Sequence, residues 1–101
     1  MASKRKLKKD VDQVIYEVVS ECYSFMDIYP KSDHEKAYDL ADKALDMQDE
    51  TITKINQIDK SLSTKETKKY FSEIRKEFIQ RAEELFKEVD ALFEEKEKQE
   101  A

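Results

Sequence analysis

The sequence predicts an all-α fold: an up-down-up antiparallel three-helix bundle with long helices, formed as one domain over residues 1–101. The chain has no glycine, one proline and 43% charged residues, which excludes β folds with glycine turns and glycine-rich phosphate loops. Three segments, 3–28, 33–58 and 64–95, carry apolar residues at the three- and four-residue intervals of an amphipathic helix. The connections between them are short, which makes successive helices antiparallel neighbours.

Helix 3–28 is predicted by a single apolar stripe. Its members are Leu7, Val11, Val14, Val18, Cys22, Phe25 and Tyr29, and Ile15, Val19 and Met26 widen it. Pro30 disfavours helical geometry at the residue before it, so we expect the helix to end there.

Helix 33–58 is predicted to open with a capping box, in which the Ser32 hydroxyl accepts from the backbone of Glu35 and the Glu35 carboxylate reaches back. Its stripe is Ala37, Ala41, Ala44, Gln48, Ile52, Ile55 and Ile58, with Leu40, Leu45 and Met47 beside it. The alanines allow a neighbouring helix to approach closely. Gln48 interrupts the stripe, so it either fixes the helix register through internal hydrogen bonds or lies at the edge of the interface.

Helix 64–95 follows a second capping-box spacing, Ser63 and Glu66. Its stripe is Phe71, Ile74, Phe78, Ala82, Leu85, Val89 and Leu92, widened by Ile79, Phe86 and Phe93. The last eight residues, EEKEKQEA, are polar on every side, and we expect this C-terminal tail to fray.

The compartment is predicted from charge and cysteine content. A single cysteine cannot form an internal disulfide, which fits a reducing environment. The basic N-terminus is followed by several acidic residues rather than by the apolar segment of a signal peptide. No run approaches the roughly 20 apolar residues of a membrane span. We therefore expect a soluble cytoplasmic protein that has no contact with a membrane.

Four stretches carry a resemblance to a known family: SKRKLKKDV, VVSECYSF, ALDMQDETITKI and YFSEIRKEFIQRAEEL. Together they resemble an uncharacterised family of roughly 100-residue all-helical proteins from Bacteroidetes bacteria. The most specific part is Met47 to Glu50 followed by Ile52. The resemblance implies a bacterial cytoplasmic helical protein and supplies no activity, cofactor, partner or catalytic residue.

The chain's one cysteine and one histidine, Cys22 and His34, are candidates for a nucleophilic pair. Cys22 lies about two helical turns before Pro30, so the axial offset from His34 is roughly 7 Å or more and direct contact is not expected. We expect Cys22 to be a buried structural thiol and His34 a solvated residue in the first turn of its helix.

The many carboxylates raise two possibilities for a metal site. A di-iron site needs Glu-x-x-His pairs, in which a glutamate stands three residues before a histidine. Lys31 occupies that position before His34, so the sequence predicts no di-iron site. The carboxylates Asp42, Asp46, Asp49 and Glu50 have helical spacing, which suits either weak binding of a hard cation or a solvated acidic face. The solvated face is the preferred interpretation. We predict no catalytic residue, no cofactor and no metal, and a protein that is not an enzyme.

Basic residues gather at one end of the predicted rod. They are Lys4, Arg5, Lys6, Lys8 and Lys9 of the first helix, and Lys65, Lys68 and Lys69 of the third. Residues 1–12 and 50–72 hold ten basic and five acidic residues, net +5, whereas the remainder holds nine and nineteen, net −10. The basic end is interpreted as pairing with an acidic end between antiparallel subunits, as binding nucleic acid phosphates, or as binding an acidic protein partner.

The apolar faces of the first and third helices look wider than a monomer needs, which predicts a homodimer. The candidate contact residues are Tyr16, Val19 and Tyr23, or Phe86 and Phe93; alternatively these side chains complete the core of a monomer. The predicted function is a non-enzymatic interaction or structural module that acts by protein–protein association, principally self-association. The alternative is a small nucleic-acid-associated protein.

Overall fold

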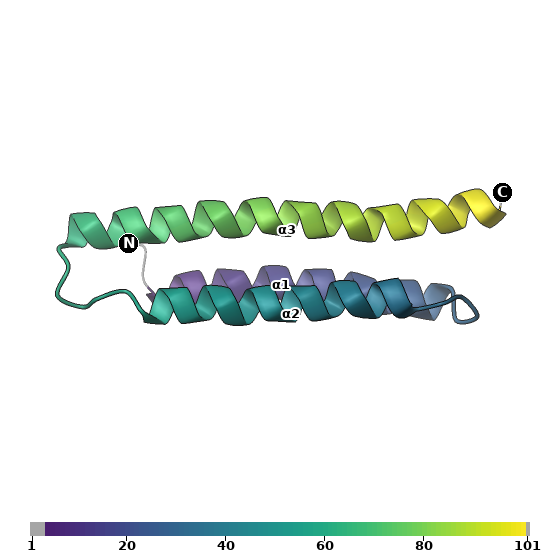
Figure 1. Cartoon of the computed structure of the whole chain (residues 1–101), viewed down its shortest axis with the longest axis horizontal. Helices are drawn as coiled ribbons and strands as arrows, with labels where there is room; N and C mark the ends of the chain where they lie inside the picture. The colour runs from purple at the N-terminus through teal and green to yellow at the C-terminus, as the bar shows by residue number, and fades with distance from the viewer. Residues whose placement is uncertain (1–3, 101) are drawn as a thin grey trace.

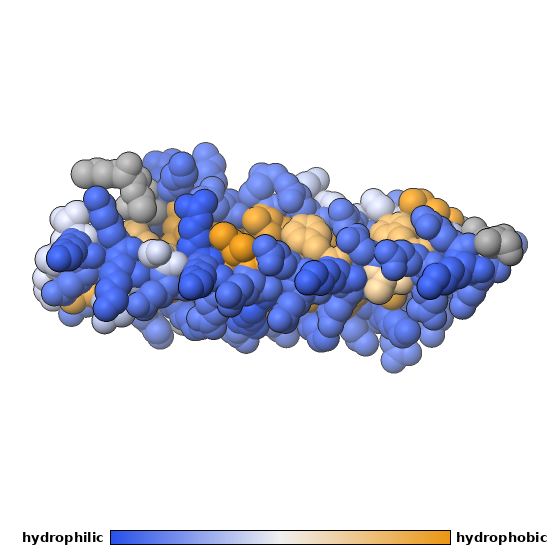
Figure 2. Space-filling view, turned by 90° about the horizontal axis from the view of Figure 1, so that it is seen from above, coloured by the Kyte–Doolittle hydropathy of each residue, from blue (hydrophilic) through white to orange (hydrophobic). Residues whose placement is uncertain are grey.

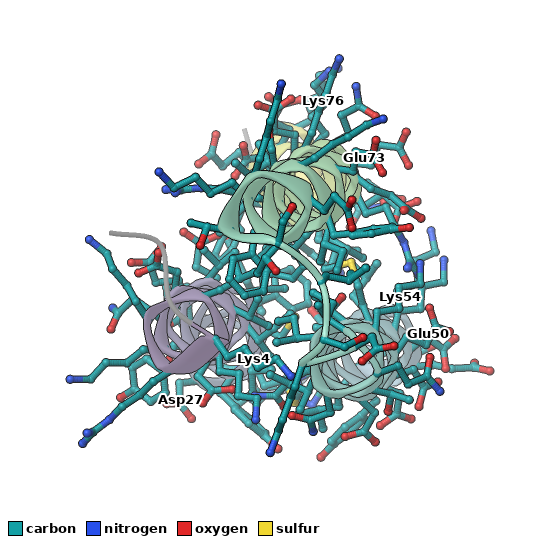
Figure 3. All side chains as sticks on the ribbon, turned by 90° about the vertical axis from the view of Figure 1, so that its left-hand side faces the viewer. Lys4, Asp27, Glu50, Lys54, Glu73 and Lys76 are labelled. Atoms are coloured by element: carbon teal, nitrogen blue, oxygen red, sulfur yellow. The ribbon has the colours of Figure 1, made fainter. Side chains whose placement is uncertain are left out.

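The computed structural model describes residues 4–100 and contains three helices: α1 (Lys4–Ile28), α2 (Glu35–Asn56) and α3 (Thr64–Glu100). They run up, down and up along a rod whose principal extents are 57 × 17 × 17 Å (Figure 1). Seen from the end, the three helices form a triangle, and each helix packs against the other two (Figure 3). The predicted three-helix bundle is therefore confirmed.

The core is the line along which the three apolar stripes meet. The most fully buried large side chains come from all three helices: Ile15, Met47, Ile55, Val11, Val18, Val89 and Cys22. Ala37 and Ala44 are both 0% exposed, so these small side chains lie where α2 is closest to its neighbours. Thr51 is buried as well, and its hydroxyl donates to the carbonyl of Met47 at 2.8 Å. This hydrogen bond from side chain to backbone satisfies a hydroxyl that would otherwise be costly to bury in the core.

The start of α2 differs from the predicted capping box. The Asp33 carboxylate, and not the Ser32 hydroxyl, accepts from the backbone N–H of Glu35, at 2.9 Å. His34 occupies the N-cap position without a side-chain capping bond. The helix consequently begins at Glu35, two residues after the predicted start at 33. An aspartate two residues before a free N–H forms an Asx-type turn, which competes with the longer capping box.

The start of α3 agrees better with prediction, because the Ser63 hydroxyl accepts from the backbone of Glu66 at 3.2 Å. In the preceding turn the Asp59 carboxylate accepts from the backbone N–H of Ser61 at 2.8 Å. At its other end α3 continues to Glu100, beyond the predicted end at 95. Residues 94–100 of the tail predicted to fray are helical, and Lys96 donates to Gln99 within the same helix at 3.2 Å; Ala101 lies outside the described residues.

A ladder of four ion pairs joins α2 to α3. The pairs are Lys36–Glu95 at 3.7 Å, Lys43–Glu88 at 3.8 Å, Glu50–Arg81 at 2.8 Å and Lys54–Glu77 at 3.2 Å. Steps of seven, seven and four residues along α2 are matched by equal steps backwards along α3. Figure 3 shows Glu50 and Lys54 on the edge of α2 that lies away from α1. This ladder fixes the antiparallel register of the two helices.

The sign of the third pair makes the ladder specific to one register. In the first, second and fourth pairs α2 supplies the lysine. In the third pair α2 supplies Glu50 and α3 supplies Arg81. Sliding one helix by seven residues would bring Lys43 to Arg81 in one direction and Glu50 to Glu88 in the other. Like charges facing each other are destabilising, so either slip is penalised as well as losing its native pairs.

Candidate interaction surfaces

Exposed apolar side chains gather on the outer side of α1 and α2. We call Tyr16, Tyr23, Tyr38 and Leu45 the tyrosine face; they are 70%, 53%, 54% and 46% exposed. They are four of the seven large apolar side chains that are exposed within residues 4–100. Single exposed apolar residues are ordinary, whereas a contiguous group is typical of an interaction surface.

Two observations place these residues side by side. The Gln48 side chain donates to Asp12 at 2.7 Å across the α1–α2 seam, which sets residue 12 opposite residue 48. Because the helices are antiparallel, Tyr16 then lies opposite Leu45 and Tyr23 opposite Tyr38, each to within one residue. Figure 3 shows Asp27 on the side of α1 turned away from α3, and Tyr23 and Tyr16 share this side by their spacing of four and eleven residues from it.

The sequence predicted Tyr16, Val19 and Tyr23 as contact residues, but not Tyr38 or Leu45. Val19 is half-buried, so it lies at the base of the tyrosine face rather than on its surface. Tyr38 and Leu45 lie beside the α2 stripe, seven residues apart. A search for a second apolar line next to the core stripe would have found them, because residues seven apart share one helix face.

The second predicted set, Phe86 and Phe93, has a different role. Both side chains are half-buried, and Phe93 packs edge-on against Phe25 with ring centroids 5.3 Å apart. The Phe93 ring also lies 6.4 Å from that of Tyr29. These aromatic contacts extend the monomer core between α1 and α3. Figure 2, seen from the α3 side, shows mainly hydrophilic surface with separate apolar patches.

Gln48 lies at an interface edge and is half-buried. Its hydrogen bond to Asp12 satisfies the side-chain amide at the rim of the α1–α2 seam. Of the two predicted roles, the structure therefore shows the edge position. The contact nevertheless helps to set the α1–α2 register, because its two partners come from different helices.

The basic residues of α1 and α3 are brought to the same end of the rod, beside the turn from α2 to α3 (Figure 1). Lys4 donates to the carbonyl of Ile58 at 3.1 Å, so this ammonium group ties the start of α1 to the turn from α2 to α3. Figure 3 shows Lys4 reaching from α1 toward α2. The remaining cations are half-buried in the case of Lys8 and exposed in the case of Arg5, Lys6, Lys9, Lys65, Lys68 and Lys69.

Cys22 is 0% exposed, and burial raises the pKa of its thiol, with a further contribution from the neighbouring Glu21 carboxylate. The thiolate needed for nucleophilic attack is thus disfavoured.

His34 is not a freely solvated residue as predicted: its Nε2 donates to the Tyr29 carbonyl at 2.8 Å. Its ring also lies edge-on to Phe25, 6.5 Å between centroids. This imidazole ties the α1–α2 connection to the end of α1.

Glu21 lies where α1 faces acidic residues. Desolvation raises the pKa of its carboxyl, and the negative charges of Asp90 and Glu17 raise it further. Among the side chains that the structure describes, residues 4–99, no group of three or more histidine, cysteine, aspartate or glutamate side chains is arranged to hold a metal ion. The helices in the same range also lack an apolar stretch long enough to cross a membrane.

Neither protein-family models, nor curated proteins, nor solved structures gave a match to this chain.

Proposed function

We propose that the protein is a cytoplasmic, bacterial, non-enzymatic helical module that works by protein–protein association, and first of all by self-association. The observation that carries this proposal is the tyrosine face, where three tyrosines and a leucine are 46% to 70% exposed on adjoining helices. A surface of this kind is stabilised when a partner removes it from water. Tyrosine suits such a surface because it combines a large apolar ring with a hydroxyl that tolerates solvent.

The size of the tyrosine face fits a reversible contact. At roughly 150–250 Å² for a whole aromatic side chain, the exposed parts of its four members amount to on the order of 400 Å². A standard interface takes about 800 Å² from each partner, so flanking polar and charged residues must supply the remainder. The association we propose is accordingly sensitive to charge as well as to apolar contact.

Sedimentation velocity over a wide concentration range tests this proposal. We expect the mass to rise from the 12.0 kDa of one chain toward twice that value as concentration increases. A mass that stays at 12.0 kDa at millimolar concentration would exclude self-association.

A second candidate function, the binding of nucleic acid, is favoured by the basic end alone. Cations in the first turn of α1 oppose the helix dipole, so helix stability does not account for them. Residues Arg5, Lys6 and Lys9 of α1 and Lys65, Lys68 and Lys69 of α3 expose their side chains there. Exposed cations at one end could neutralise several phosphates.

Filter binding of a single-stranded and a duplex oligonucleotide at low and moderate salt separates the two functions. If the second function holds, affinity should fall steeply with salt and be lost when Lys65, Lys68 and Lys69 are changed to glutamine. The matched control changes Lys76, Lys87 and Lys98, which lie on α3 away from this end. Equal loss in both variants, or no binding in the wild type, would reject nucleic acid binding.

A further inference from the structure

The outer side of α1 carries a symmetrical series of residues. Arg5, Lys9, Tyr16, Tyr23 and Asp27 follow one another at intervals of four, seven, seven and four, and all five side chains are exposed. These intervals keep the residues on one helix face. Tyr16 is the midpoint of both the series and the helix, since α1 runs from Lys4 to Ile28. One half of the series is basic, and the other half ends in an acid.

We propose that this face binds a second copy of the chain in an antiparallel two-fold dimer, with the axis passing at Tyr16; the inference rests on the self-association proposed above and specifies its geometry. Two-fold symmetry about Tyr16 reverses the series. Arg5 of each copy then lies opposite Asp27 of the other, and the two Tyr16 rings meet at the axis. Lys9 of each copy lies over Tyr23 of the other, a cation–π arrangement.

The opposite orientation is disfavoured by the same residues. In a parallel dimer Arg5 would face Arg5, Lys9 would face Lys9 and Asp27 would face Asp27. Whole-chain charge points the same way, since the basic end carries net +5 and the remainder net −10. An antiparallel dimer sets each basic end on an acidic end, which is electrostatically complementary.

Charges on α2 decide which helices approach most closely. Asp42, Asp46 and Asp49 are exposed along α2, so packing α2 against α2 would bring like charges together. The closest contact is therefore α1 against α1, with α1 of each copy lying over the α1–α2 seam of the other. Tyr38 and Leu45 lie on the α2 side of that seam, which explains their exposure in the single chain.

The first experiment tests the face. The double variant Tyr16→Ser, Tyr38→Ser is compared by sedimentation with the control Tyr70→Ser, Ile79→Ser, whose residues on α3 are 47% and 43% exposed. We expect the dissociation constant of the first variant to rise at least tenfold while the control stays within about twofold of wild type. Helical circular dichroism verifies that both variants fold. A dimer that persists unchanged in the Tyr16, Tyr38 variant overturns the proposed face.

The second experiment tests the orientation. A nitroxide label at Lys6→Cys, an exposed position of α1 outside the series, reports the distance between the same site in the two copies by pulsed electron resonance in a Cys22→Ala background. A two-fold axis at Tyr16 sets Lys6 of one copy opposite Met26 of the other, 20 residues away, so the antiparallel dimer predicts about 30 Å along the axis. A parallel dimer predicts less than about 20 Å, since the two labels would lie on facing helices.

The outcomes separate the inference from the function on which it rests. If the two labels are close together, or if the dimer persists unchanged in the Tyr16, Tyr38 variant, the proposed antiparallel arrangement is overturned. Self-association itself still stands in either case. A chain that stays monomeric at every concentration overturns both.

Discussion

The two long edges of α2 are built differently. The edge toward α3 carries the ladder of four ion pairs, in which the one reversed pair, Glu50–Arg81, favours a single register. The edge toward α1 carries the Gln48–Asp12 hydrogen bond and, beyond it, the exposed Tyr38 and Leu45. The first edge is complete within the chain. The second presents apolar surface that a partner would remove from water.

The two edges show that a solvent-exposed side chain can have either of two roles, depending on whether it is charged or apolar. Ion pairs on the α2–α3 edge are solvent-exposed and contribute little stability each, but together they discriminate between registers. The tyrosines on the α1–α2 edge are 53% to 70% exposed, so much of their surface stays in water in the single chain. Changes at the α2–α3 edge should therefore alter stability, whereas changes on the tyrosine face should alter association.

The largest expected effect is at the core between the two edges. Ala44 is 0% exposed, so Ala44→Leu forces extra methylene groups into a packed interior and should lower the free energy of unfolding by about 1–3 kcal/mol. Urea denaturation measures it. The control Leu45→Ala, one residue away and 46% exposed, should stay within about 0.5 kcal/mol of wild type. Equal losses in both variants would contradict the assigned helix rotation.

A smaller effect is expected when the ladder is inverted at one step. Glu50→Lys replaces the 2.8 Å pair with Arg81 by a like-charge contact and should cost about 1 kcal/mol. Adding Arg81→Glu restores an ion pair and should recover most of the loss. The control Asp42→Lys makes the same charge change outside the ladder. If the double variant were no more stable than Glu50→Lys alone, the Glu50–Arg81 pair would not contribute to the α2–α3 register.

Gln48→Ala removes the hydrogen bond to Asp12 and should cost roughly 0.5 kcal/mol, since the pair is exposed to water. Thermal unfolding of this variant beside Gln80→Ala, an exposed glutamine on α3, measures the difference. A loss above about 2 kcal/mol would mean that Gln48 acts as a buried register-setting residue.

The smallest effect concerns pH. Desolvation, Asp90 and Glu17 raise the pKa of Glu21 above its usual 4.5, so the folded state binds its proton more tightly than the unfolded state. The resulting stabilisation is present below pH 4.5 and is lost as pH rises through the raised value. At neutral pH the charged carboxylate is unfavourable, so Glu21→Gln should stabilise the fold by roughly a few tenths of a kcal/mol.

Stability measured from pH 3 to 7 checks this sign. Glu21→Gln should flatten the decline with rising pH. Asp59 provides the opposite case, because hydrogen bonds from the backbone and side chain of Ser61 lower the pKa of its carboxyl. Its contribution is present above its usual pKa and lost as pH falls, so Asp59→Asn should weaken the fold most near neutral pH. Identical slopes in the two variants would refute these assignments.

Much of the fold could be predicted from apolar spacing, because a stripe at three- and four-residue intervals both defines a helix and selects its buried face. Helix ends were less predictable: Asp33 and Ser32 compete for the same backbone group, and only geometry decides. The ion-pair ladder could not be predicted, because it depends on the relative register of α2 and α3. Likewise, Tyr38 could be grouped with the predicted Tyr16 and Tyr23 only after the Gln48–Asp12 contact had aligned α1 with α2.

The most direct test of the account is a charge exchange across the proposed two-fold axis, measured as the dimer dissociation constant by sedimentation equilibrium at low salt. Arg5→Glu and Asp27→Arg should each weaken the dimer several-fold, because each single change creates a like-charge pair between copies. The double variant should regain close to wild-type affinity, since both pairs are restored with reversed sign. Three variants that all associate like the wild type would contradict antiparallel association through α1.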